Sequence, residues 1–171
     1  MLGKEYDKQD CAMARALEVV GERWTLLIVR DAFYGVRRFN EFQAHLDVPK
    51  AVLSDRLSGL VDDEILERRP DPQHAGRFLY ELTPAGRDLW PVLNALLAWG
   101  GRHRHSGSRE FRHAACDSRL DDAGYCERCE LTPAPEDIVT VPRRGRRRTR
   151  RKDPVAVALG ERHRLLEPLE T

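Results

Sequence analysis

Apolar side chains recur at helical spacing on both sides of a short interruption between residues 38 and 57. They are Phe39, Phe42 and Leu46 before the interruption and Leu53, Leu57 and Leu60 after it. Steps of three or four residues predict two amphipathic helices that share one core. The interruption is Asp47-Val48-Pro49, and Pro49 suits only the first turn of a helix, so it fixes the start of the second helix to within a residue or two. This pattern is typical of a helix-turn-helix.

A pattern with a period of two follows the second helix. Residues 65–69 and 77–83 flank a turn-rich stretch over residues 70–76, and Phe78, Tyr80 and Leu82 alternate with their neighbours in partial polarity contrast. A half-buried β-strand alternates in this way, because successive side chains point to opposite faces. The segment therefore predicts a β-hairpin that packs against the helices.

A further helix is predicted over residues 84 to 103. Thr83 supplies a cap, Pro84 suits the first turn, and leucines follow on one stripe. Pro91 lies inside this helix and should kink it or divide it. A helix-turn-helix alone also fits many all-α cores, but the order of helix, helix-turn-helix, hairpin and long helix predicts a winged helix-turn-helix. The predicted fold class is mainly α with a small β-hairpin wing (α+β).

The outward face of the second helix carries the first candidates for DNA contact. The buried leucine stripe turns Lys50, Ala51 and Ser54 outward, and Arg56 is a further candidate because arginine can bind guanine through two hydrogen bonds. Arg56 has a competing interpretation as a partner of nearby acidic residues: Asp55, Glu41 or Asp63. Arginines beside this helix and in the hairpin could bind phosphates. The predicted DNA-binding residues are Arg37, Arg38, Lys50, Ala51, Ser54, Arg56, Arg68, Arg69 and Arg77.

Several motifs stand in a characteristic order between Cys11 and His103. They are VGERWTLLI over residues 20–28, Gly35 ahead of RFNEF, Leu53-Ser54, Arg56-Leu57, Tyr80 with Leu82-Thr83, Gly86, Pro91 and Trp99. With these motifs the chain resembles the HxlR-type branch of bacterial winged-helix transcription regulators, which are related in architecture to the MarR type. The chain departs from that pattern at Glu22, Pro49, Ala51 and Glu64. Ala51 bears on which operator sequence is bound, and Glu64 bears on how the chain enters the wing. None of the four departures bears on the predicted fold.

The resemblance implies a homodimer that binds double-stranded DNA at a near-palindromic operator and acts as a repressor. It also implies a dimer interface built from the first helix and the helix of residues 84 to 103. These two segments carry more apolar residues than so small a domain needs for its own core, so some of them are available to a second copy. The apolar residues are Leu17, Val20, Trp24 and Leu27 on one segment and Leu93, Leu96, Leu97 and Trp99 on the other.

Cys11 stands at the start of the first predicted helix, where the helix dipole stabilises a thiolate. Arg15, one turn later, adds to this effect, and Asp10 opposes it. Because several relatives sense oxidants or electrophiles through a cysteine at the matching position, the resemblance implies a redox-sensor role for Cys11. The alternative is a small buried hydrophobic residue without chemistry.

The remaining cysteines lie close together after the winged-helix region. His113 and Cys116 form an HxxC pair, and after nine residues Cys126 and Cys129 form a CxxC pair. Four nitrogen and sulfur ligands in two such pairs match a closed tetrahedral zinc site, so we expect one structural zinc per chain. Free thiols, or a redox pair of Cys126 and Cys129, remain open as alternatives.

Charge is distributed unevenly along the 171 residues, although the net charge is only +1. Residues 1 to 105 have a balance of −1, whereas residues 106 to 171 have a balance of +2 that includes the basic run over residues 143–152. So dense a run predicts a mobile arm that binds polyanions without sequence preference, or else a solubilising tail. The predicted domains are a DNA-binding and dimerisation domain over residues 1–105, a cysteine–histidine knuckle over 106–135, and the arginine-rich arm and tail over 136–171.

The sequence also bears on function classes beyond DNA binding. We find no glycine-rich phosphate loop, nucleophile elbow or HExxH motif and therefore expect no enzymatic activity. No apolar segment approaches the ~20 residues that cross a bilayer, so we expect no membrane partner and a cytoplasmic, nucleoid-associated protein. The main alternative function is an RNA- or ribosome-associated protein that binds through the arginine-rich arm and the knuckle.

Overall fold

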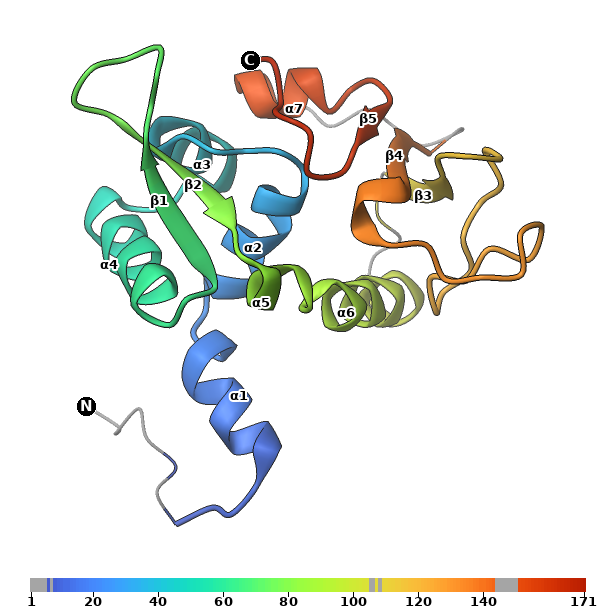
Figure 1. Cartoon of the computed structure of the whole chain (residues 1–171), viewed down its shortest axis with the longest axis horizontal. Coiled ribbons are helices and arrows are strands. Elements are labelled where there is room, and N and C mark those ends of the chain that lie inside the picture. The colour runs from blue at the N-terminus through green and yellow to red at the C-terminus, as the bar shows by residue number, and fades with distance from the viewer. Residues whose placement is uncertain (1–5, 7, 105–106, 108, 144–150) are drawn as a thin grey trace.

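A computed structural model describes residues 6, 8–104, 107, 109–143 and 151–171 (Figure 1). Its amino-terminal part consists of α1 (Ala12–Val20), α2 (Thr25–Phe33), α3 (Phe39–Leu46), α4 (Lys50–Asp62), β1 (Leu66–Pro70), β2 (Phe78–Leu82), α5 (Pro84–Arg87) and α6 (Trp90–His103). The later elements are β3 (Arg109–His113), a 3-10 turn (Pro135–Asp137), β4 (Ile138–Pro142), α7 (Pro154–Ala158) and β5 (His163–Arg164). In the part of the chain that is described, no helix is both long and apolar enough to cross a membrane.

Helices α2, α3 and α4 and the hairpin β1–β2 form a winged helix-turn-helix. The predicted apolar stripe is buried, with Phe42, Leu53 and Leu57 fully inaccessible and packed in one core with Phe33 of α2. The antiparallel strands pair from Leu66 with Leu82 to Pro70 with Phe78. Figure 1 shows the hairpin beside α4, and contacts between β1 and α4 agree with this view. The predicted fold class is confirmed.

The two prolines act at helix starts. Pro49 is the N-cap of α4, one residue from the predicted position, and Asp47 before it adopts a left-handed conformation with φ 54° that ends α3. Pro91 occupies the first turn of α6 and divides the predicted long helix into α5 and α6. Proline is tolerated there because a first-turn N–H has no partner within the helix.

The carboxyl-terminal region differs from the predicted division at residue 135. Strand β4, from the predicted arm and tail, lies between β3 of the predicted knuckle region and β5, in an antiparallel sheet of order β3-β4-β5. The physical reason is that Ile138 and Val139 are apolar, and both are buried in this strand, Ile138 within the hydrophobic core. One sheet therefore combines β3, from the predicted knuckle region, with β4 and β5, from the predicted arm and tail. Residues 144–150 of the arginine run lie outside the described residues, so the predicted mobile arm is not tested.

The chain end packs onto the winged helix. Helix α7 contacts α3, and Val155, Leu165 and Leu169 are buried. Leu169 N–H donates to the Gly35 carbonyl at 3.1 Å. Trp90 of α6 lies between Phe33 and Phe111, with both pairs of ring centroids 5.1 Å apart. These contacts join the sheet and the tail to the winged-helix core.

Candidate nucleic-acid interface and cysteine–histidine cluster

The outward face of α4 is accessible as expected. Lys50, Ala51 and Ser54 are exposed, whereas Leu53 and Leu57 point into the core. The exposed residues lie in the first two turns of the helix, the part that reaches base edges when a recognition helix enters the major groove. Their contact with DNA stays a prediction.

Arg56 is engaged within the protein. Its Nη2 lies 3.1 Å from Glu22 Oε2 and its Nη1 lies 3.4 Å from Asp55 Oδ2. The pairing with Asp55 matches one of the alternatives raised from the sequence, and the pairing with Glu22 was missed. Because Glu22 precedes α2, this pair links the recognition helix to the start of the core helix.

Arg37 and Arg38 face the hairpin. Nη1 of Arg37 lies 2.8 Å from Glu81 Oε1, and its Nη2 donates to the Leu166 carbonyl at 3.1 Å. Arg38 forms ion pairs with Glu41 and Asp71. These contacts orient the wing, and they leave both guanidinium groups less available to phosphate than the sequence suggested.

The three wing arginines have different surroundings. The guanidinium carbon of Arg68 lies 3.8 Å from the centre of the Phe78 ring, a cation–π contact. Arg69 pairs with Glu67 at 2.5 Å. Arg77 is exposed and, among the described residues, has no side-chain partner. Of the three, Arg77 is thus the most available to a phosphate.

Cys11 is exposed and forms the N-cap of α1. The alternative of a buried hydrophobic residue does not hold for the single chain. Arg15, expected to favour the thiolate, pairs with Glu18 at 2.9 Å and also donates to the Tyr6 carbonyl. The Arg15 guanidinium is therefore engaged by Glu18 and by the chain that precedes α1.

The structure brings the predicted metal ligands together. One ligand atom from each of His113, Cys116, Cys126 and Cys129 lies within 4.8 Å of all the others. Cys116 Sγ is 3.5 Å from both His113 Nδ1 and Cys126 Sγ. Ligand atoms of a tetrahedral zinc site are about 3.5–3.8 Å apart, given zinc–sulfur bonds of about 2.3 Å. The four side chains thus lie close to the required geometry.

Local backbone contacts position this cluster. His113 ends β3, and Cys126 N–H donates to the Leu131 carbonyl at 2.8 Å. Hydrogen bonds from Ser118 lower the pKa of Cys116 to about 6. The hydrogen bond with Cys116, together with burial, raises the pKa of Cys129 to about 11. All four cysteines of the chain are free thiols in this structure.

The surfaces of α1 and α6 carry exposed apolar side chains. Those that could form the expected dimer contact are Met13, Leu17, Val92, Leu96 and Trp99.

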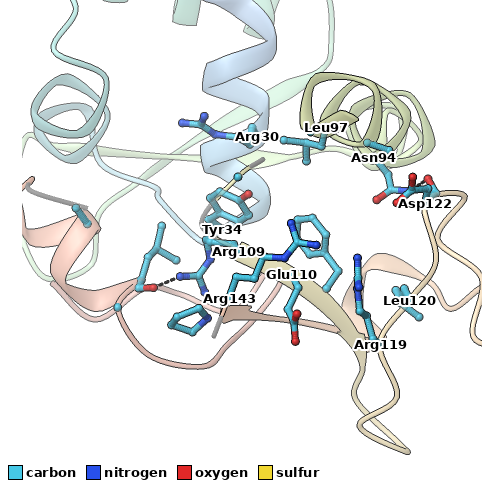
Figure 2. Close-up of a pocket in the computed structure, with 18 of the residues that line it drawn as sticks. Arg30, Tyr34, Asn94, Leu97, Arg109, Glu110, Arg119, Leu120, Asp122 and Arg143 are labelled. Carbon is cyan, nitrogen blue, oxygen red and sulfur yellow. Dashed lines mark hydrogen bonds between the residues drawn. The ribbon is translucent and has the colours of Figure 1, made fainter. Parts of the chain in front are cut away.

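The structure also contains a cavity of about 880 Å³ that the sequence did not indicate. It is bordered by α2, α6, β3 and α7 (Figure 2). Its lining residues are far apart in the chain, so no local spacing could have indicated it.

Comparisons with known proteins agree with this geometry. The model of the HxlR-like helix-turn-helix family matches residues 19–108. An HTH-type transcriptional regulator of Mycobacterium tuberculosis is 40% identical over 134 residues, covering 72% of this chain and 85% of that protein. YodB, an HTH-type transcriptional regulator of Bacillus subtilis, is 30% identical over 96 residues, which are 56% of this chain and 86% of YodB.

Two solved structures are similar in fold and sequence. The candidate transcription factor PA1607 has a TM-score of 0.55 and 39% identity, covering 58% of this chain and 69% of its own. The redox regulator HypR in its reduced form has a TM-score of 0.51 and 28% identity, covering 55% of this chain and 94% of its own. The chain therefore belongs to the HxlR-like helix-turn-helix family of DNA-binding transcriptional regulators, which are not enzymes.

Proposed function

We propose that this protein is a homodimeric repressor that binds a near-palindromic operator. The observation that carries the proposal is the exposed face of α4, with Lys50, Ala51 and Ser54 accessible and the wing beside it. In this proposal Lys50 and Ser54 contact base edges or phosphates. Arg77 binds phosphate from the wing, because it is exposed and lacks a side-chain partner among the described residues.

A dimer supplies the second half-site contact. Met13 of α1 is 66% exposed and Trp99 of α6 is 49% exposed, and apolar area of this kind favours association. Two copies joined through α1 and α6 would present two recognition helices about one DNA turn, ~34 Å, apart. Binding to a repeated half-site follows from that symmetry.

The test is footprinting of the intact protein on its own promoter region with excess random duplex and, separately, excess RNA. We expect a protected, near-palindromic site that survives both competitors. Lys50→Ala and Ser54→Ala should weaken protection by about tenfold each, since one good base contact contributes about 1–3 kcal/mol. Arg87→Ala, an exposed arginine on α5, is the matched control and should leave protection unchanged. Loss of the footprint to RNA would instead favour an RNA-binding protein.

We also propose that oxidation of Cys11 weakens operator binding. The thiol is exposed and stands at a helix start, and the fold neighbour HypR is named a redox regulator. Treatment with diamide should release the wild-type protein from the operator and leave a Cys11→Ser variant bound. Equal release of both proteins would remove the sensor proposal.

Zinc binding by His113, Cys116, Cys126 and Cys129 is the third part of the proposal. Support comes from the mutual distances of their ligand atoms and from the closed set of nitrogen and sulfur donors. Metal analysis of the purified protein should find about one zinc per chain. Cys126→Ser should lose the metal, while Cys11→Ser keeps it. A Cys126–Cys129 disulfide in the metal-free protein, found by mass spectrometry, would support the redox pair instead.

A further inference from the structure

The cavity bordered by α2, α6, β3 and α7 has an unusual charge pattern. Its volume of about 880 Å³ falls within the range of small-molecule sites. Six arginines line it, at positions 30, 102, 109, 119, 143 and 151, against three carboxylates: Glu110, Asp121 and Asp122. The lining thus carries an excess of positive charge.

The three carboxylates are already engaged. Asp122 pairs with Arg102, and Glu110 pairs with Arg112 at 2.7 Å. Asp121 Oδ1 accepts hydrogen bonds from the Ala123 and Tyr125 N–H groups, both at 2.8 Å. None of these contacts involves Arg109 or Arg119, so the carboxylates leave both of those cations without a counter-charge.

Arg109 carries most of the argument. Its Nε donates to Thr140 Oγ1 at 2.7 Å, and its other nitrogens donate to the carbonyls of Leu159 and Glu161. All three acceptors are neutral, and no carboxylate among the described residues pairs with this half-buried guanidinium. A buried charge without a counter-ion is costly, so an anion beside Arg109 would be stabilised strongly.

Part of the remaining lining is apolar, beside the polar side chains of Tyr34, His45 and Asn94. Leu97 and Ala98 of α6, Phe111 of β3 and Leu159 after α7 border the cavity. Figure 2 shows Leu97 on the α6 side and Tyr34 between Arg30 and Arg109. A ligand for this cavity would combine an apolar body with one anionic group, because the lining offers partners to both.

We propose that the cavity binds an apolar organic carboxylate that acts as an effector of DNA binding. In this arrangement the carboxylate pairs with Arg109, and the hydrocarbon body packs against Leu97 and Phe111. The regulatory half of the inference rests on the proposed function, whereas the binding half does not.

A chain of contacts connects the cavity with the helix-turn-helix. Arg30 lines the cavity and donates from two nitrogens to Asp31 Oδ1, at 2.9 and 2.6 Å. His45 of α3 lies 4.0 Å from Asp31 and 2.9 Å from Asp153, whose side chain caps α7. The guanidinium carbon of Arg30 also lies 5.8 Å from the centre of the Tyr34 ring, and Tyr34 lies between Arg30 and Arg109. A ligand on Arg109 would displace Tyr34, and with it the Arg30–Asp31 pair, and so shift α3 relative to α7. The helix α4 that follows would move with α3.

Calorimetry with the full chain and 2-naphthoate tests the binding half without DNA. We expect saturable binding, with 2-naphthamide, the uncharged analogue, at least about tenfold weaker because it lacks the charge-assisted hydrogen bonds. Arg109→Gln should weaken naphthoate by about the same factor. Arg119→Glu is a second variant at an exposed position, and Arg87→Glu is its matched control outside the cavity.

Several outcomes would overturn the binding half. They are equal affinity for the acid and the amide, no loss in either cavity variant, or displacement of naphthoate by inorganic phosphate alone. If naphthoate binds as expected, titration of the protein–operator complex tests the effector role, with a shift of the DNA Kd expected in wild type and not in Arg109→Gln. An unchanged Kd overturns that role, whereas absence of any footprint overturns the proposed function instead.

Discussion

Arg38 Nε donates to Asp71 Oδ2 at 2.9 Å, which ties the start of α3 to the turn of the wing. The Asp71 side chain is fully buried and also accepts from the Gln73 N–H at 2.8 Å. This pair holds the turn of the wing against the helix-turn-helix. Loss of this pair should therefore loosen the wing while the rest of the fold stays intact.

Arg38→Ala should loosen the wing. The Asp71 N–H, which donates to the Arg77 carbonyl at 2.9 Å, should exchange with deuterium faster, because the turn loses its anchor to α3. Arg77→Ala removes a side chain without such an anchor and is the control. If both variants exchange like wild type, the pair does not hold the wing.

The same pair predicts a dependence on pH. Burial raises the pKa of Asp71, but the hydrogen bonds from Arg38, the Gln73 N–H and His74 outweigh it and lower the pKa to about 2. The unfolded value is about 3.9, so the carboxylate stabilises the folded wing above that pH and the effect is lost as pH falls toward 2. The protection factor of the wing amides in wild type, which is their exchange rate corrected for the intrinsic effect of pH, should therefore fall between about pH 4 and pH 2. Asp71→Asn should remove this fall, and an identical profile in the variant would contradict the assignment.

Gly35→Ala should detach the chain end. Gly35 has φ +82°, and an added Cβ would collide with the Glu167 carbonyl oxygen. Gly76 has a similar φ of +76° but open space around it, so Gly76→Ala is the matched control. The left-handed conformation alone costs about 1–2 kcal/mol, and Gly35→Ala should cost more. Urea unfolding measures the difference, and limited proteolysis detects release of the tail. Equal destabilisation by Gly35→Ala and Gly76→Ala would mean that the tail does not pack closely against Gly35.

The contribution of the Arg56–Glu22 ion pair to stability can be measured separately from any contact of Arg56 with DNA. The side chains are 20% and 37% exposed, so we expect a coupling of only about 0.2–1 kcal/mol in a double-mutant cycle of unfolding. If Arg56 also contacts DNA, Arg56→Ala should weaken operator binding far more than Glu22→Ala does. Similar losses in both variants would assign Arg56 a structural role alone.

Local sequence patterns were sufficient to predict the winged helix. The spacing of Leu53, Leu57 and Leu60 determines which face of α4 is buried, since a helix repeats every 3.6 residues. Pro49 and Pro91 act within one turn of the chain, so their effects on helix starts were predictable. The spacing of His113, Cys116, Cys126 and Cys129 likewise indicated a cluster, which the turns between them bring together.

Contacts between distant segments required the tertiary structure. Whether Arg38 faces DNA or Asp71 depends on where the wing turn lies, and no spacing within α3 contains that information. The pairing of β3 with β4 spans a long connection, and the cavity forms only where α2, α6, β3 and α7 meet. The sequence alone determined the local elements, because their hydrogen bonds and apolar periods lie within a few residues. The tertiary structure decided which charges are neutralised and which remain available, because that depends on side chains far apart in the chain.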